Sequence, residues 1–266
     1  DSLFLSEDGI NTINEYIKPL LIGKDVSTFK DNEKEIDNLM INDKPLHTAL
    51  RYGITQALLH ATAKANGISM PEVVRKEYNI ESKEYHRIPM FAQSGDDRYS
   101  NVDKMIIKEM EVMPHALINN IETKLGQQGE ILKEYVAWLR GRVLHLRKSS
   151  EYNPIFHIDV YGTIGVIFDG DIEKMYNYMV ELEEIAMPFT LRIEGPVDAG
   201  NRKETMEALR DLTKIINDNN RTIEIVADEW CNTLADVKYF ADNNAGHMLQ
   251  VKTPDLGGVT NIIEAL

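Results

Sequence analysis

The spacing of hydrophobic and polar residues changes near residue 88, and this divides the chain into two predicted parts. Before that point apolar residues recur at helical spacing, most clearly over 46–65, and no run shows the alternation of a strand. Gly67 is expected to end this helix and Pro71 to begin the next one. The pattern therefore predicts a helical first domain over residues 1–84.

From residue 88 onward, short apolar runs alternate with longer amphipathic segments, which is typical of parallel strand–helix–strand units. Strands are predicted at 88–93, 112–117, 155–159, 190–194, 222–228 and 248–252, and helices at 102–109, 130–146, 171–186, 202–217, 234–243 and from Gly258 onward. About six such units lie within residues 85–266, whereas a closed (β/α)8 barrel has eight. Because the last predicted helix stops at Leu266 and the first residue is Asp1 instead of Met, we expect a piece of a longer enzyme.

Three acidic residues follow three consecutive predicted strands. Asp159, Glu194 and Asp228 each end an apolar run, and they are 35 and 34 residues apart, close to one strand–helix–strand repeat. The carboxyl ends of parallel barrel strands share one rim, where barrel enzymes carry their chemistry. Three carboxylates at that rim favour a Mg²⁺ site. For each acid alone, the alternative is a cap on the next helix or a pair with a nearby lysine.

Gln250 and Lys252 end the next predicted strand, and their two-residue spacing puts them on one face. Burial and a nearby cation both lower the pKa of a lysine, so Lys252 is a candidate general base near neutral pH. The alternative is a solvated lysine at the edge of a loop. Gln250 is placed to hydrogen-bond a carboxylate of a substrate.

Two earlier predicted strands add further candidates. His115 is either structural, or a second base or a donor to a substrate carboxylate. Gln93 is a less specific candidate of the same sort. His157 shares a face with Asp159 but lies one layer deeper, so it is assigned to packing. Two adjacent glycines, Gly257 and Gly258, are too short a motif to predict a phosphate-binding site.

Composition narrows the class of partner. The chain has 43 acidic and 29 basic residues, a net charge of −14, which argues against nucleic acid and anionic membranes as partners. A small anionic substrate remains compatible, because a bound divalent ion can reverse the local field. The single cysteine, Cys231, favours a reducing compartment. With no apolar run near the ~18–20 residues of a membrane helix and no signal-peptide pattern, we expect a cytoplasmic protein.

Several ordered segments of the chain carry a resemblance to a known family. They are FAQSGDDRY at 91–99, HIDVYGTIG at 157–165, RIEGP at 192–196, ADEWCNT at 227–233 and KTPDLGG at 252–258. On these segments the chain resembles the 3-methylaspartate ammonia-lyases of the enolase superfamily, and the resemblance covers essentially all 266 residues.

The resemblance implies an α/β fold: a modified (β/α)8 TIM-type barrel of the enolase superfamily with an N-terminal capping domain. Both would be incomplete here. Residues 1–84 would be the helical part of the capping domain, and residues 85–266 about six of the eight barrel units. The β part of the family's capping domain has no counterpart in this sequence. The last barrel strands of the family also have no counterpart here, including a Thr-Cys pair after the seventh strand that the family uses to hold substrate.

The resemblance also implies a role for each candidate residue. Asp159, Glu194 and Asp228 would hold Mg²⁺, and Lys252 would be the principal base. Substrate carboxylates would be contacted by His115, Gln93 and Gln250, with His115 able to act as a base on the opposite face. Members of this family use K⁺ as a helper ion, form homodimers and are associated with glutamate fermentation. The resemblance implies the same for this protein.

The implied reaction is the elimination of ammonia from L-threo-3-methylaspartate to give mesaconate. Lys252 would remove the C3 proton while Mg²⁺ stabilises the enolate charge. One alternative is another enolase-superfamily enzyme, a racemase or an acid-sugar dehydratase, although the place of their Lys-x-Lys motif is taken here by Met113-Pro114-His115. The other alternative is a non-catalytic fragment of such an enzyme.

Overall fold

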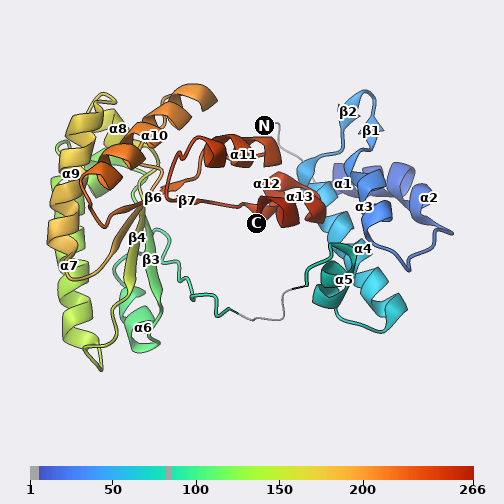
Figure 1. Cartoon of the computed structure of the whole chain (residues 1–266), viewed down its shortest axis with the longest axis horizontal. Helices are drawn as coiled ribbons and strands as arrows, with labels where there is room; N and C mark the ends of the chain where they lie inside the picture. The colour runs from blue at the N-terminus through green and yellow to red at the C-terminus, as the bar shows by residue number, and fades with distance from the viewer. Residues whose placement is uncertain (1–5, 82–85) are drawn as a thin grey trace. The chain divides into compact units, whose positions relative to one another are not determined.

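The computed structural model describes residues 6–81 and 86–266, which form two compact units (Figure 1). The first unit comprises Asp1–Tyr85, Asn232–Leu234 and Val251–Leu266, and the second His86–Cys231 and Ala235–Gln250. The predicted domain boundary at residues 84 and 85, like the N-terminal residues 1–5, lies outside the described residues. Since the last 16 residues group with the first unit, the assignment of all of 85–266 to a barrel domain stays a prediction.

The first unit is helical, as the hydrophobic pattern predicts, with one short hairpin. Its elements are α1 (Ser6–Thr12), the π-helical turn η1 (Ile13–Ile17), α2 (Lys18–Leu21), α3 (Lys30–Asp37), β1 (Met40–Ile41), β2 (Lys44–Pro45), α4 (Thr48–Asn66), α5 (Met70–Glu77), α12 (Thr253–Leu256) and α13 (Val259–Ala265). The hairpin was not predicted from the sequence, because two-residue strands are too short to show alternation. Its turn residues, Asn42 and Asp43, both have positive φ, which these residue types tolerate well.

Local sequence signals account for the ends of the central helices. Gly67 ends α4 in the left-handed conformation, with φ +64°. At the start of α5, Ser69 and Glu72 form a reciprocal capping box, and Pro71 occupies the first turn. The core of this unit includes Phe29 and Ile36, both fully buried.

The C-terminal segment is fastened to α3 and α4 within the first unit. The Thr253 hydroxyl donates to the Tyr52 hydroxyl at 3.1 Å, and the Val259 amide donates to Thr55 Oγ1 at 3.2 Å. Buried Glu33 accepts from both the amide and the hydroxyl of Thr260, at 3.2 and 2.6 Å. These contacts hold α12 and α13 in place directly after Lys252.

The glycine pair at 257–258 has a steric role in this fastening. Gly257 has φ +78°, and a β-carbon there would lie 2.9 Å from the Arg51 guanidinium carbon. A β-carbon at Gly258 would overlap the Glu33 carboxylate and approach Asp37 Oδ1 to 2.8 Å. The pair therefore lets the backbone pass close to charged side chains.

The second unit is built on a parallel sheet in the order β3-β4-β5-β6-β7. The strands are β3 (Val112–Leu117), β4 (Ile155–Asp159), β5 (Leu191–Glu194), β6 (Glu224–Ala227) and β7 (Met248–Leu249). The connecting elements are α6 (Val102–Ile107), η2 (Ile121–Leu125), α7 (Glu130–Leu146), α8 (Thr163–Ile167), α9 (Ile172–Ala186), α10 (Arg202–Asp218) and α11 (Leu234–Asp242). The strand predicted at 88–93 is not regular: the segment pairs with β3 through isolated bridges, Phe91 to Val112 and Gly95 to Ala116.

The two faces of this sheet differ in chemistry. Helices α7, α9 and α10 line one side of the strands (Figure 1) and cover apolar residues such as Phe156, Ile193 and Ile225, which are fully buried. On the other face, strand register pairs His157 with Arg192 and Asp159 with Glu194. The sheet therefore presents polar side chains on the face that the helices leave free. Within the described ranges, no helix has the length and apolar character to cross a membrane.

Candidate metal centre

Three neighbouring strands bring three carboxylates together at their carboxyl ends. Asp159 and Glu194 are the last residues of β4 and β5, and Asp228 directly follows β6. One oxygen from each lies within 4.8 Å of the others, and the three residues are buried, with exposed fractions of 5%, 1% and 7%. The structure thus unites the three acids that the sequence singled out.

The charges of these carboxylates are strongly coupled. Burial, and then the charge of Glu194, raise the pKa of Asp159 to about 7. For Glu194, burial alone would raise the pKa, but the adjacent imidazoles of His115 and His157 outweigh it and lower the pKa to about 2. The cluster therefore retains a proton near neutral pH unless a cation compensates its charge. Three buried oxygen donors with excess negative charge fit a hard divalent ion such as Mg²⁺.

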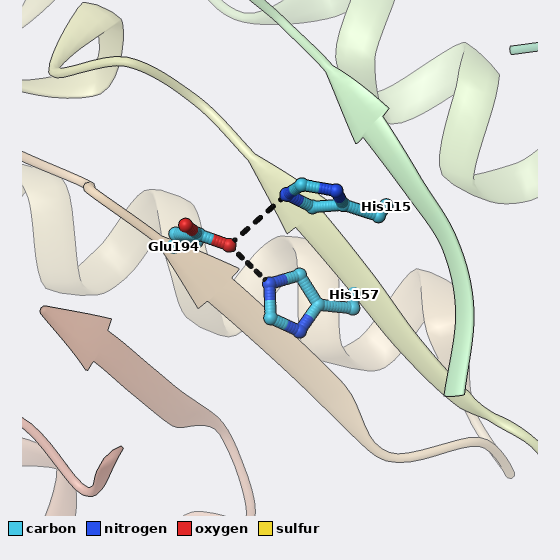
Figure 2. A group of neighbouring side chains, drawn as sticks. All are labelled: His115, His157 and Glu194. Atoms are coloured by element: carbon cyan, nitrogen blue, oxygen red, sulfur yellow. Dashed lines mark hydrogen bonds and ion pairs between the residues drawn. The ribbon is translucent and has the colours of Figure 1, made fainter. Parts of the chain in front are cut away.

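Two histidines converge on the same glutamate (Figure 2). His157 Nε2 lies 2.5 Å from Glu194 Oε2, and His115 Nε2 lies 3.2 Å from the same oxygen. His115 Nε2 is also 3.8 Å from Asp159 Oδ2. The assignment of His157 to packing was wrong, because its ring contacts the carboxylate directly. Its position two residues before Asp159, on the same strand face, was the available signal.

His115 reaches this cluster through an irregular strand. It has φ +43°, and the register of β3 against β4 shifts between Pro114 and Ala116. A bulge of this kind redirects a side chain, and a left-handed non-glycine residue costs on the order of 1 kcal/mol or more. The Met113–Pro114 peptide bond that precedes it is cis. The alternation of the sequence does not show this bulge.

Phe91 forms a wall beside the two imidazoles. Its ring centroid lies 5.1 Å from that of His115 and 4.8 Å from that of His157. The two histidine rings also meet edge to face at 5.2 Å. These ring contacts, together with the strands, fix the orientation of both imidazoles.

The remaining candidates from the sequence are Gln93, Gln250 and Lys252. Gln93 is exposed and lines a cavity of about 230 Å³ together with Lys104 and Met105 of α6. Gln250 is half-buried and follows β7, where its backbone N–H donates to the Ala227 carbonyl at 2.8 Å. Lys252 is half-buried at the start of α12, in the first unit. The roles of these three residues stay predictions.

A contact that the sequence did not predict joins two loops beside the carboxylates. Asp198, in the loop after β5, accepts from the Trp230 indole N–H at 3.0 Å and from the Gly200 amide at 2.9 Å. Trp230 lies two residues after Asp228 and has φ +68°. Asp198 therefore links the loops that follow Glu194 and Asp228.

Comparison with known proteins places this arrangement in a family. A likeness to muconate lactonizing enzyme from Pseudomonas fluorescens, at 16% identity and a TM-score of 0.64, covers 97% of this chain and 60% of that one. At that identity the likeness shows the fold alone. Together with the more specific matches below, it confirms the predicted α/β fold class.

More specific matches follow. The family model for the methylaspartate ammonia-lyase N-terminus matches residues 1–79, and the model for its C-terminus matches residues 82–266. A solved structure of β-methylaspartase from Clostridium tetanomorphum, a Mg complex, is 57% identical with a TM-score of 0.93. The Citrobacter amalonaticus methylaspartate ammonia-lyase, solved with (2S,3S)-3-methylaspartic acid, is 52% identical with a TM-score of 0.96. Each match covers 100% of this chain and 64% of the other.

The chain belongs to the methylaspartate ammonia-lyase family. The resemblance found in the sequence is thus confirmed. The chain spans 64% of the length of the relatives in these matches.

Proposed function

We propose that the protein containing this chain is a Mg²⁺-dependent carbon–nitrogen lyase that eliminates ammonia from L-threo-3-methylaspartate to give mesaconate. The observation that carries the proposal is the buried cluster of Asp159, Glu194 and Asp228 at the ends of adjacent parallel strands. Membership of the family supports the reaction, and relatives solved as a Mg complex and with 3-methylaspartic acid support the ion and the substrate.

In this proposal Asp159, Glu194 and Asp228 would hold the metal. When bound there, Mg²⁺ supplies positive charge that stabilises the negative charge developing on a substrate carboxylate. The neighbouring His115 and His157 keep Glu194 ionised, since their imidazoles lower its pKa. Glu194 is therefore ready to bind a cation without first losing a proton.

Lys252 is the proposed principal base. As a neutral amine it takes the C3 proton, and the C3–H electron pair moves toward the adjacent carboxylate as an enolate. That pair then forms the C2–C3 double bond as the C2–N bond breaks, and ammonia leaves. The contacts of Thr253 and Thr260 with Tyr52 and Glu33 support a fixed position for the backbone that follows Lys252. A fixed backbone limits the conformational freedom of the base.

His115 is proposed to act on the opposite face of the substrate, as a base or as a donor to a carboxylate. Its burial beside Glu194 and Asp159 supports a place at the reacting centre. Gln93 and Gln250 are proposed to contact the substrate carboxylates. We also propose K⁺ as a helper ion, a homodimeric assembly and a cytoplasmic location, which K⁺ titration of activity, sedimentation and cell fractionation respectively test.

Substrate profiling tests the reaction class. Purified protein with Mg²⁺ is offered threo-3-methylaspartate, other aspartate derivatives and a panel of acid sugars. The proposal expects an unsaturated product and free ammonia from 3-methylaspartate alone or from its close analogues. Dehydration of an acid sugar, or racemisation without loss of ammonia, would instead place the protein with the other enolase-superfamily enzymes.

A further inference from the structure

Beside the oxygen cluster, the structure holds a second group of convergent metal-ligand atoms. His115 Nε2, His157 Nε2 and a Glu194 oxygen lie within 4.8 Å of one another (Figure 2). The three side chains come from β3, β4 and β5, adjacent strands of one sheet, and all three are buried. Two nitrogen donors and one carboxylate are thus held on a rigid frame.

The chemistry of this group differs from that of the oxygen cluster. Hard ions such as Mg²⁺ prefer oxygen ligands, whereas imidazole suits Zn²⁺, Co²⁺, Ni²⁺ and Cu²⁺. Two histidines and one glutamate are also a known ligand set for Zn²⁺ that leaves a fourth position open. The two groups share Glu194 and select different classes of ion.

The spacing of the donor atoms is close to that of a tetrahedral site. With metal–ligand bonds of roughly 2.0–2.1 Å, tetrahedral ligand atoms are roughly 3.3 Å apart. His115 Nε2 is already 3.2 Å from Glu194 Oε2, and His157 Nε2 is 2.5 Å from it. The His157 Nε2–Glu194 Oε2 distance would have to lengthen by roughly 0.8 Å to reach this value, and the two imidazole nitrogens lie within 4.8 Å of one another.

The protonation pattern of the imidazoles also permits metal binding. The Nδ1 atoms of His115 and His157 are buried and have no hydrogen-bond partner among the described residues. Moving a ring proton from Nε2 to Nδ1 therefore breaks no hydrogen bond at Nδ1, and it presents the Nε2 lone pair to the ion. Phe91 and the edge-to-face contact between the rings keep both imidazoles aimed at Glu194.

We propose that His115, His157 and Glu194 form a second metal site, selective for borderline divalent ions such as Zn²⁺ and Co²⁺, that shares Glu194 with the oxygen cluster. Sites that hold two metal ions about 3.5–4 Å apart are an established arrangement. An ion at this second site occupies the His115 lone pair, so it blocks any role of His115 as a base. The site is therefore inhibitory in an enzyme that uses His115.

Cobalt titration tests the site directly, independently of activity. Co²⁺ is added to the protein in a large excess of Mg²⁺, and visible absorption is recorded, because nitrogen-ligated Co²⁺ of low coordination number absorbs far more strongly than Co²⁺ bound to six oxygens. The wild-type protein is expected to bind one Co²⁺ per chain with intense visible absorption. Excess Mg²⁺ should not remove this absorption, whereas excess Zn²⁺ should.

Two variants separate the sites. His157→Gln is expected to weaken the binding of the strongly absorbing Co²⁺ by more than about 100-fold. It should still bind Mg²⁺, measured by calorimetry, and this binding also shows that the variant is folded. Asp228→Asn is expected to weaken Mg²⁺ binding and retain the Co²⁺ spectrum. His145→Gln, at an exposed position on α7, is the matched control and should change neither.

Two results would overturn the proposal. One is a Co²⁺ spectrum that His157→Gln leaves unchanged in intensity and affinity. The other is a single Co²⁺ per chain that excess Mg²⁺ displaces completely, which would mean that Co²⁺ occupies the oxygen cluster alone. Inhibition by Zn²⁺ that His157→Gln fails to relieve would count against the inhibitory role.

Discussion

Mg²⁺ binding should release a proton from the carboxylate cluster, and the amount should depend on pH. Because the pKa of Asp159 is raised to about 7, the cluster of the metal-free protein holds about 0.9 proton at pH 6 and about 0.1 at pH 8. The metal requires an ionised carboxylate. The apparent Mg²⁺ affinity should therefore fall by about tenfold, or about 1.4 kcal/mol, for each pH unit below 7, and be nearly constant above pH 8.

Calorimetric titration measures this proton release directly. At each pH, Mg²⁺ is titrated in two buffers with different ionisation enthalpies, and the difference in observed heat gives the number of protons released. The expected values are about 0.9 at pH 6 and about 0.1 at pH 8. Asp159→Asn removes the carboxyl, so its residual binding should release little or no proton at pH 6. Equal heats in both buffers at pH 6 for the wild-type protein would refute the assigned charge state of the cluster.

Further predictions concern the base, the metal ligands and the fastening of the C-terminal segment. Lys252→Ala should lower kcat by at least about 10²–10⁴-fold with Mg²⁺ binding retained; loss of that binding by calorimetry would contradict this division of roles. Loss of a residue that only hydrogen-bonds a metal ligand weakens metal binding about 10–100-fold, and Asp228→Asn should weaken Mg²⁺ binding by more than that. Unchanged Mg²⁺ affinity would exclude Asp228 as a ligand. Gly258→Ala should destabilise the protein by about 1–3 kcal/mol, because the new methyl group overlaps Glu33. The control Gly53→Ala, in helix α4 with open space around it, should be neutral or stabilising by up to about 1 kcal/mol; equal denaturation midpoints for the two would remove the steric argument. Mg²⁺ should raise the midpoint of a single cooperative thermal transition, and a broad, Mg²⁺-independent melt would favour a non-catalytic fragment.

The long amphipathic elements were predictable because their hydrophobic period extends over several turns. The helix predicted at 130–146 is α7 with the same bounds, and the strand predicted at 155–159 is β4. The convergence of Asp159 and Glu194 was also predictable, since equal positions in successive parallel strands share one edge of the sheet. Periodic sequence and repeated topology thus carry this part of the fold and of the candidate site.

Features that depend on one residue or on distant packing were not predictable. The bulge at His115 has no signature in the alternation of β3, yet it directs the ring toward Glu194. The contact of His157 with the same carboxylate depends on how β4 and β5 align, although its place two residues before Asp159 already put it on the face of the carboxylates. The grouping of the residues after Lys252 with the first unit depends on hydrogen bonds to Glu33, which is more than 200 residues away in sequence. Such long-range contacts are invisible to a local pattern.

Ultraviolet detection of mesaconate formed from threo-3-methylaspartate is the most direct test of a metal-dependent ammonia-lyase site in this protein. The assay is run with Mg²⁺ and K⁺, then with a chelator, and then with Mg²⁺ restored. We expect product with Mg²⁺, loss of product with chelator and recovery when Mg²⁺ is added again, with Asp228→Asn inactive throughout. Product formation that is insensitive to chelator, or that persists in Asp228→Asn, would contradict a metal centre formed by these three carboxylates.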